Sequence, residues 1–193
     1  MAGSLEFIKS ATGSSVSSLD VTNCFSDNYD VYMISISKIN GLQSSGNRVL
    51  RLRLLDSTST VIDQTEYDYA VLDLRSYDTY TEQKSTTSTA FDRIMIYGSG
   101  DVEGGATIYV YNPYDSSSYT FGTYQSSGLV EASDRGFGTK GIAVHHNAEQ
   151  ITGINFTPNA DSFDLTVKVY GVKWIMAGSL IKIDEEIVSS AVA

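Results

Sequence analysis

The residues best equipped for chemistry are two adjacent histidines, His145 and His146, the only histidines in the chain. They lie in a segment, Gly141–His146, whose apolar residues predict a β-strand. Neighbouring residues of a strand point to opposite faces, so the two imidazoles cannot bind one metal ion together. We therefore expect one half-buried and one exposed histidine, both with structural roles, and no metal site.

Other signatures of catalysis or cofactor binding are missing from the sequence. The glycine-rich segments Gly98–Gly100 and Gly136–Gly138 fall between expected strands with no helix after them, so neither forms a phosphate-binding loop. There is no Gly-x-Ser-x-Gly motif, and the acidic loops lack the ligand spacing of a calcium loop. Cys24 is the only cysteine, which excludes an intramolecular disulfide and favours a small buried thiol. These absences predict a protein that is not an enzyme and needs no cofactor.

Two tyrosine-rich segments are the candidate binding loops. One contains Tyr77 and Tyr80, and the other contains Tyr114 and Tyr119, all among Ser, Thr and Asp residues. Tyr supplies rigid contact area with a polar end, and Ser supplies adaptable hydrogen bonds, a mixture typical of binding loops. Ordinary solvated loops are the alternative interpretation.

The charge of the chain excludes two classes of partner. The formal net charge is −10 at pH 7, and no basic run occurs along the sequence. Nucleic acid binding requires Lys and Arg to neutralise phosphates, and an acidic surface is repelled by anionic lipid. No apolar run approaches the ~20 residues of a membrane span, and the first residues lack the features of a signal peptide. We expect a protein that is made and soluble in a cytoplasm and binds neither nucleic acid nor membrane.

The elements that must position these residues are strands. Apolar–polar alternation is clearest in Tyr29–Ile39, Arg48–Leu55 and Phe163–Trp174. In the second of these, the leucines at 50, 52 and 54 are expected on one face and Arg51 and Arg53 on the other. We expect Val61–Tyr67 to form a hairpin with Arg48–Leu55, and Ser76–Thr89 to be a long exposed loop. Ten or eleven strands with no crossover helix predict an all-β fold, an antiparallel β-sandwich with jelly-roll topology.

A repeat divides the chain. Met1–Leu5 recurs letter for letter at Met176–Leu180, and Val16–Leu19 is similar to Val188–Ala191. A cloning artefact or coincidence is the alternative explanation. The repeat predicts a β-sandwich domain over residues 1–175 and the beginning of a second repeat, or a connecting arm, over residues 176–193. The second segment alternates strongly, so we expect an assembly strand there that needs a partner edge; its apolar residues are Leu180, Ile181, Ile183 and Ile187.

Several short motifs resemble the virion proteins of tailed bacteriophages, particularly marine ones, that are described as tail-fibre-like or structural. The motifs are Ser4–Lys9, Tyr29–Tyr32, Glu66–Ala70 and Val169–Lys173. The resemblance covers residues 4–174, and Ile181–Ala193 is similar to the opening of a sister domain in such proteins. It implies a β-sandwich, homo-oligomeric assembly that is commonly trimeric, and a place on the particle as a tail fibre, tail component or capsid decoration.

The hypothesis that follows is a non-enzymatic virion structural protein. It would be assembled in the host cytoplasm, dock onto other virion proteins through its sandwich domain and project further repeats outward, in possible contact with a glycan of the host surface. The alternative is a lectin-like carbohydrate-binding module. A polysaccharide-degrading spike is disfavoured, because no β-helix repeat occurs and no pair of carboxylates flanking a groove can be identified.

Overall fold

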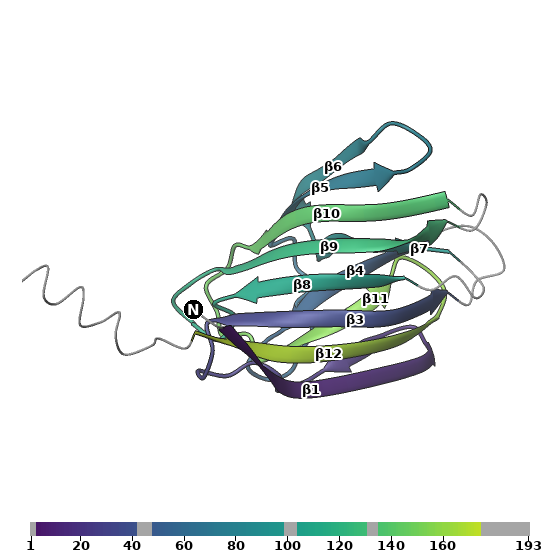
Figure 1. Ribbon diagram of the computed structural model, residues 1–193. Helices are drawn as coiled ribbons and strands as arrows, with labels where there is room; N and C mark the ends of the chain where they lie inside the picture. Colours follow the sequence, from purple (N-terminus) through teal and green to yellow (C-terminus); the bar gives the residue numbers. More distant parts are fainter. Residues whose placement is uncertain (1–2, 42–47, 99–103, 131–134, 175–193) are drawn as a thin grey trace, which may run out of the picture.

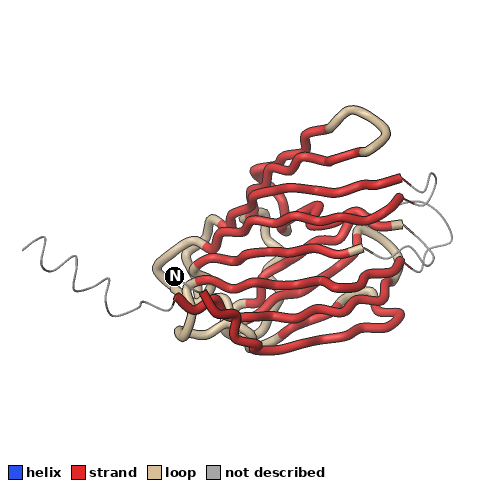
Figure 2. The backbone as a smooth tube through the Cα atoms, viewed as in Figure 1, coloured by secondary structure: helices blue, strands red, loops and turns tan. Residues whose placement is uncertain are grey.

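The computed structural model describes residues 3–41, 48–98, 104–130 and 135–174, and these ranges form twelve β-strands. Figure 1 shows them as two layers, and Figure 2 shows that the described chain consists of strands and loops only. The strands are β1 (Gly3–Val16), β2 (Leu19–Val21), β3 (Val31–Gly41), β4 (Arg48–Leu55), β5 (Tyr67–Arg75), β6 (Thr81–Ser88), β7 (Phe91–Tyr97), β8 (Gly105–Tyr111), β9 (Thr120–Val130), β10 (Arg135–His145), β11 (Gly153–Pro158) and β12 (Phe163–Trp174).

The strands form an antiparallel β-sandwich, which confirms the predicted fold class. The large sheet has the order β1-β12-β3-β8-β9-β10-β5-β6, and the small sheet has the order β2-β11-β4-β7. Every pairing between these strands is antiparallel. The jelly-roll topology expected from the sequence stays a prediction. The domain boundaries and the assembly strand stay predictions as well, because residues 176–193 lie outside the described ranges; the residues expected in that strand are Leu180, Ile181, Ile183 and Ile187.

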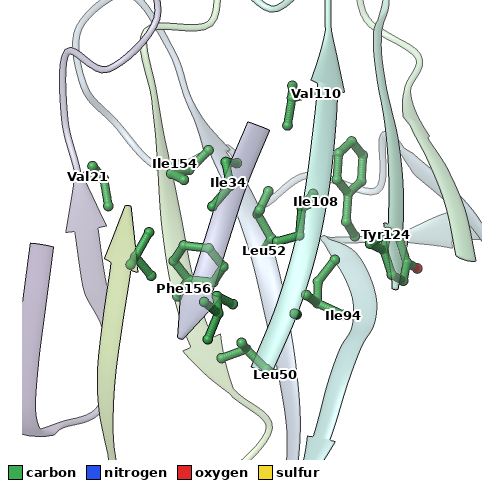
Figure 3. Close-up of a cluster of buried hydrophobic side chains, with 14 of the residues drawn as sticks. Val21, Ile34, Leu50, Leu52, Ile94, Ile108, Val110, Tyr124, Ile154 and Phe156 are labelled. Atoms are coloured by element: carbon green, nitrogen blue, oxygen red, sulfur yellow. The ribbon is translucent and has the colours of Figure 1, made fainter. Parts of the chain in front are cut away.

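The core lies between the two sheets and follows the predicted alternation. Leu50, Leu52 and Leu54 of β4 are all fully buried, and they meet side chains such as Ile34, Ile108 and Phe156 in one continuous cluster (Figure 3). The facing residues of β12 are buried as well, namely Phe163, Leu165, Val167 and Val169. Burial of each such side chain contributes about 1.5–3 kcal/mol, so the alternation accounts for how each sheet faces the other.

Polar contacts also join the two sheets. Asp73 of β5 is fully buried and forms an ion pair with Arg93 of β7, whose Nε donates to Asp73 Oδ1 over 3.2 Å. Arg93 has a left-handed backbone (φ 57°) where the β4–β7 register shifts. An irregularity of this kind changes the direction of a side chain, and here it brings the guanidinium to the large sheet.

Two predicted elements are wrong. Val61–Tyr67 pairs with β4 only at its start, through the antiparallel bridge of Val61 to Leu55 and the hydrogen bond that Ile62 N–H donates to Leu54 O, and it forms no hairpin strand. Tyr67 begins β5, which pairs with β10 and β6. The predicted loop Ser76–Thr89 contains β6, the edge strand of the large sheet. Its residues are polar on both faces, so the periodicity of the sequence does not reveal it. It is a strand because it pairs with β5. Cys24 is buried as predicted, although it follows β2 in a loop.

Candidate functional site

The two candidate tyrosine loops lie at opposite ends of the large sheet. Tyr77 and Tyr80 are in the connection from β5 to β6, next to the row that pairs Arg75 with Phe137. Tyr114 and Tyr119 are in the connection from β8 to β9, at the end where His145 pairs with Thr120. Eight residue steps along β10 separate these rows, about 27 Å at the rise of an antiparallel strand. The two loops therefore do not form one site.

The four tyrosines also differ in their surroundings. Tyr77, Tyr80 and Tyr119 are exposed, whereas Tyr114 is half-buried and packs against the core. The guanidinium of Arg135 lies 5.3 Å from the centre of the Tyr77 ring. Each loop stays a candidate for binding, with Tyr80 and Tyr119 as the side chains free to meet a ligand.

The histidines face opposite sides as predicted. His145 is fully buried, while His146 reaches the surface and approaches Asp68 Oδ1 over 3.2 Å through its Nδ1. They do not form a common site.

An exposed apolar row crosses the outer face of the large sheet. The strand registers place one residue from each of the eight strands in line, and we call this line the outer row; its members are Phe7, Tyr170, Met33, Tyr109, Thr123, Ile142, Ala70 and Lys84. Ile142 is 61% exposed and Phe7 is 59% exposed. Seven strand spacings make the row about 34 Å long.

A second apolar line runs beside the outer row, one pleat further along the strands. Its paired members are Val31, Tyr111, Phe121 and Val144, and it ends at Asp68 of β5. On the other side of the outer row the residues are polar; this polar row consists of Ser10, Lys168, Ser35, Thr107, Gln125 and Lys140, with Leu72 and Glu82 beyond them. The face is therefore divided lengthwise into an apolar half and a polar half.

The sheet is hollowed on this face between β6 and β8. Two adjoining hollows of about 740 and 780 Å³ share the side chains of Ala70, Lys84, Thr123 and Ile142. Figure 1 shows the β5–β6 hairpin angled against β10. Side chains of this hairpin, among them Lys84, line one side of both hollows. The other wall includes Tyr109 and Phe121. We call this the groove, and its floor is apolar.

The described lining of the groove is suited to binding. Its charged side chains are those of Lys84, Lys140, Asp68 and Glu82, and they stand among Thr, Ser, Gln and apolar residues. Apolar side chains such as Ile142 provide contact energy, and Gln125 and the lysines provide hydrogen bonds. The arrangement favours adhesion to another molecule through shape and apolar contact.

The apolar outer face of the large sheet could have been recognised in the sequence from two strands that do not alternate. An antiparallel strand with one solvated face normally alternates between apolar and polar residues. Ile108–Tyr111 of β8 and Ile142–Val144 of β10 are apolar on both faces, although the described chain covers only the inner one. Strands of this kind therefore leave apolar side chains on a face that the described chain does not cover.

No protein-family model matches the chain, and no curated protein gives a significant match. Among solved structures, a family 7 alginate lyase, A1-II′, is 8% identical over 77% of this chain and 64% of the enzyme, with a TM-score of 0.24. The CBM2 module of the evolved Dit of Lactobacillus casei BL23 phage J-1 is 8% identical over 82% of this chain and 70% of the module, with a TM-score of 0.19. A fructofuranosidase of Schwanniomyces occidentalis is 6% identical over 89% of this chain and 34% of the enzyme, with a TM-score of 0.18. The chain thus spans less than two thirds of the alginate lyase, and similarities this low carry no argument about fold or function. Within the ranges that the structure covers, no helix is long and apolar enough to cross a membrane.

Proposed function

We propose that this chain is a non-enzymatic structural protein of a bacteriophage particle and that it assembles through the outer face of its large sheet. The observation that supports assembly is the outer row, a mainly apolar line across the large sheet in which Ile142 and Phe7 are more than half exposed. The place on a phage particle, as a tail fibre, tail component or capsid decoration, rests on the sequence resemblance.

The size of the apolar area supports a protein partner. The outer row is about 34 Å long, and its apolar neighbour, which spans β3 to β5, is about 19 Å long; with about 7 Å for the width of each row, they cover on the order of 370 Å². The largest apolar patch of a typical monomer is about 300–600 Å², and such a patch is often functional. The polar row adds on the order of 240 Å², which brings this face to about 600 Å², the low end of the area that each partner buries in a specific interface.

The charges on this face favour a second copy of the chain as the partner. The three rows contain three lysines, Lys84, Lys140 and Lys168, and two carboxylates, Asp68 and Glu82, although the whole chain has a net charge of −10. Two acidic chains repel each other least where they meet through a surface that is not acidic. A surface with both signs of charge can also pair with itself. The proposed assembly is a homo-oligomer, with the trimeric state implied by the resemblance.

Sedimentation velocity at micromolar concentration tests this proposal. The wild-type chain is expected to sediment as an oligomer, and a variant with Tyr109→Asp and Ile142→Asp is expected to sediment as a folded monomer. Ser57→Asp, at an exposed position in the connection after β4 and outside the three rows, is the control and should stay oligomeric. Circular dichroism establishes that each variant is folded.

Two results would count against the proposal. A wild-type chain that sediments as a monomer would refute self-assembly. An oligomer that persists after both Asp substitutions would show that the interface lies elsewhere on the chain. Removal of residues 176–193 distinguishes the expected assembly strand from the sheet face. The truncated chain should stay folded, because the described strands are complete by Trp174, and it should keep the part of the assembly that the sheet face provides. Labelled electron microscopy of particles would then locate the protein.

The composition of the groove favours carbohydrate binding as a second candidate function. The ring of Tyr109 lies in the groove together with Gln125 and Lys140, which provide hydrogen-bonding groups. Sugars bind to an aromatic face flanked by such groups. A glycan array with the wild-type chain and Tyr109→Ala tests this: specific sugar binding that the substitution abolishes would support a lectin-like module, and no binding would leave assembly as the function.

A further inference from the structure

Three side chains distant in sequence meet beside the end of β10. Glu66 directly precedes β5, His145 is the last residue of β10, and Glu149 lies in the connection from β10 to β11. His145 Nε2 lies 3.3 Å from Glu66 Oε2 and 3.7 Å from Glu149 Oε1. One ligand atom from each residue lies within 4.8 Å of the other two.

These separations suit a metal ion with tetrahedral coordination. Zinc binds imidazole nitrogen and carboxylate oxygen at about 2.0–2.2 Å, so two ligands at tetrahedral corners are about 3.3–3.6 Å apart. The two measured separations from His145 Nε2 are close to this range. Glu66 is 33% exposed and Glu149 is 29% exposed, so solvent has access to the fourth corner.

The ring of His145 is presented to the two carboxylates only. The imidazole is fully buried, and its Nδ1 has no hydrogen-bond partner in the described structure. Every polar contact of this ring is therefore made through Nε2, the atom that approaches Glu66 and Glu149. The ring of Tyr67 lies 4.9 Å from that of His145 and helps to enclose it.

Two carboxylates and one imidazole nitrogen meet at this point, and they come from three separate segments of the chain. Such a set of oxygen and nitrogen ligands is one that a divalent cation would neutralise.

We propose that Glu66, His145 and Glu149 form a binding site for a divalent cation of the zinc class, with a water molecule as the fourth ligand. Calcium and magnesium are disfavoured, because calcium takes 6–8 oxygen ligands, magnesium demands octahedral oxygen coordination, and imidazole suits zinc. The bound ion connects the start of β5, the end of β10 and the segment before β11. It thereby fixes a connection whose Ile151 and Thr152 are buried against the small sheet.

Zinc titration of the full chain after removal of metal by a chelator tests the site. Calorimetry should show one Zn²⁺ bound per chain, and Co²⁺ in its place should give the visible absorption of tetrahedral coordination. Glu66→Gln and Glu149→Gln should each weaken Zn²⁺ binding by more than about 100-fold, because replacing second-shell partners alone costs about 10- to 100-fold. Glu82→Gln, an exposed carboxylate on β6, is the matched control and should bind as the wild type does.

Each other outcome overturns the assignment. Zn²⁺ binding that is equal in the wild type and in both Gln variants would place the ion elsewhere, and no binding would leave the three residues as a hydrogen-bonded cluster. Preference for Ca²⁺ or Mg²⁺ over Zn²⁺ would refute the zinc class. Circular dichroism of the variants separates loss of the site from loss of the fold. None of these results depends on oligomeric state, so the assembly proposal is tested separately.

Discussion

Asp73→Ala is expected to destabilise the protein strongly, because Asp73 is the acidic partner of an ion pair between the two sheets. Its side chain is fully buried, and that of Arg93 is only 20% exposed. Besides the two contacts from Arg93, Asp73 Oδ2 accepts a hydrogen bond from Thr81 Oγ1 over 3.2 Å. Truncation leaves a largely buried guanidinium without an anion, which costs about 3–5 kcal/mol. The exposed fifth of Arg93 retains contact with water, so we expect about 3 kcal/mol.

Urea denaturation measures this cost as a lower midpoint with an unchanged slope. Asp78→Ala is the control, since Asp78 is 54% exposed in its pair with Arg75 and the loss should stay below about 1 kcal/mol. The double variant Asp73→Leu with Arg93→Met removes both charges, and it should lose less stability than Asp73→Ala alone. A loss for Asp73→Ala as small as that for Asp78→Ala would refute the reasoning.

Three further predictions concern the core and can be checked by denaturation or thiol labelling. Leu52→Ala and Val167→Ala should each lower the free energy of unfolding by about 2–4 kcal/mol, and a loss below about 0.5 kcal/mol would contradict the prediction that both side chains face the core. Gly141→Ala places a Cβ 2.6 Å from the Tyr124 ring and should cost about 1–3 kcal/mol, whereas Gly136→Ala, with its nearest neighbour at 3.5 Å, should cost little. Burial raises the pKa of Cys24 from 9.0 to about 12, so the folded protein should resist thiol reagents at pH 8 and label only on unfolding. The unfolded chain releases this proton first, so stability should fall between pH 9 and 12 by about 1.4 kcal/mol per unit, a slope that Cys24→Ala should reduce.

Local pattern predicted strands that have at least one apolar face, and it failed for a strand that is polar on both faces. The alternation of apolar and polar residues predicted both β4 and β12 and the face that each strand buries, because burial of one face fixes which side chains point inward. β6 is polar on both faces and was predicted as a loop. The turn of Arg93 toward Asp73 depends on a backbone irregularity, which periodicity does not describe.

The candidate sites depend on contacts between distant segments, which a single sequence does not contain. The outer row needs the register of eight strands, and its only local signal is the apolar character of β8 and β10 on both faces. His145 was correctly separated from His146, but its neighbours Glu66 and Glu149 come from other connections, and Glu66 precedes it by 79 residues. The tyrosines were a local signal as well, and the fold distributes them over two ends of the sheet.

The pairing of β1 with β12 has a consequence for synthesis. Phe7 pairs with Tyr170, so the edge of the large sheet joins the first described strand to the last. A ribosome adds about 5–20 residues per second, so β1 leaves it roughly ten to thirty seconds before its partner exists. During that interval Leu5 and Phe7 stand on an unpaired strand, exposed to chaperones and to other nascent chains. Slow translation or crowded polysomes should therefore promote misassembly through β1 even when the mature fold is stable.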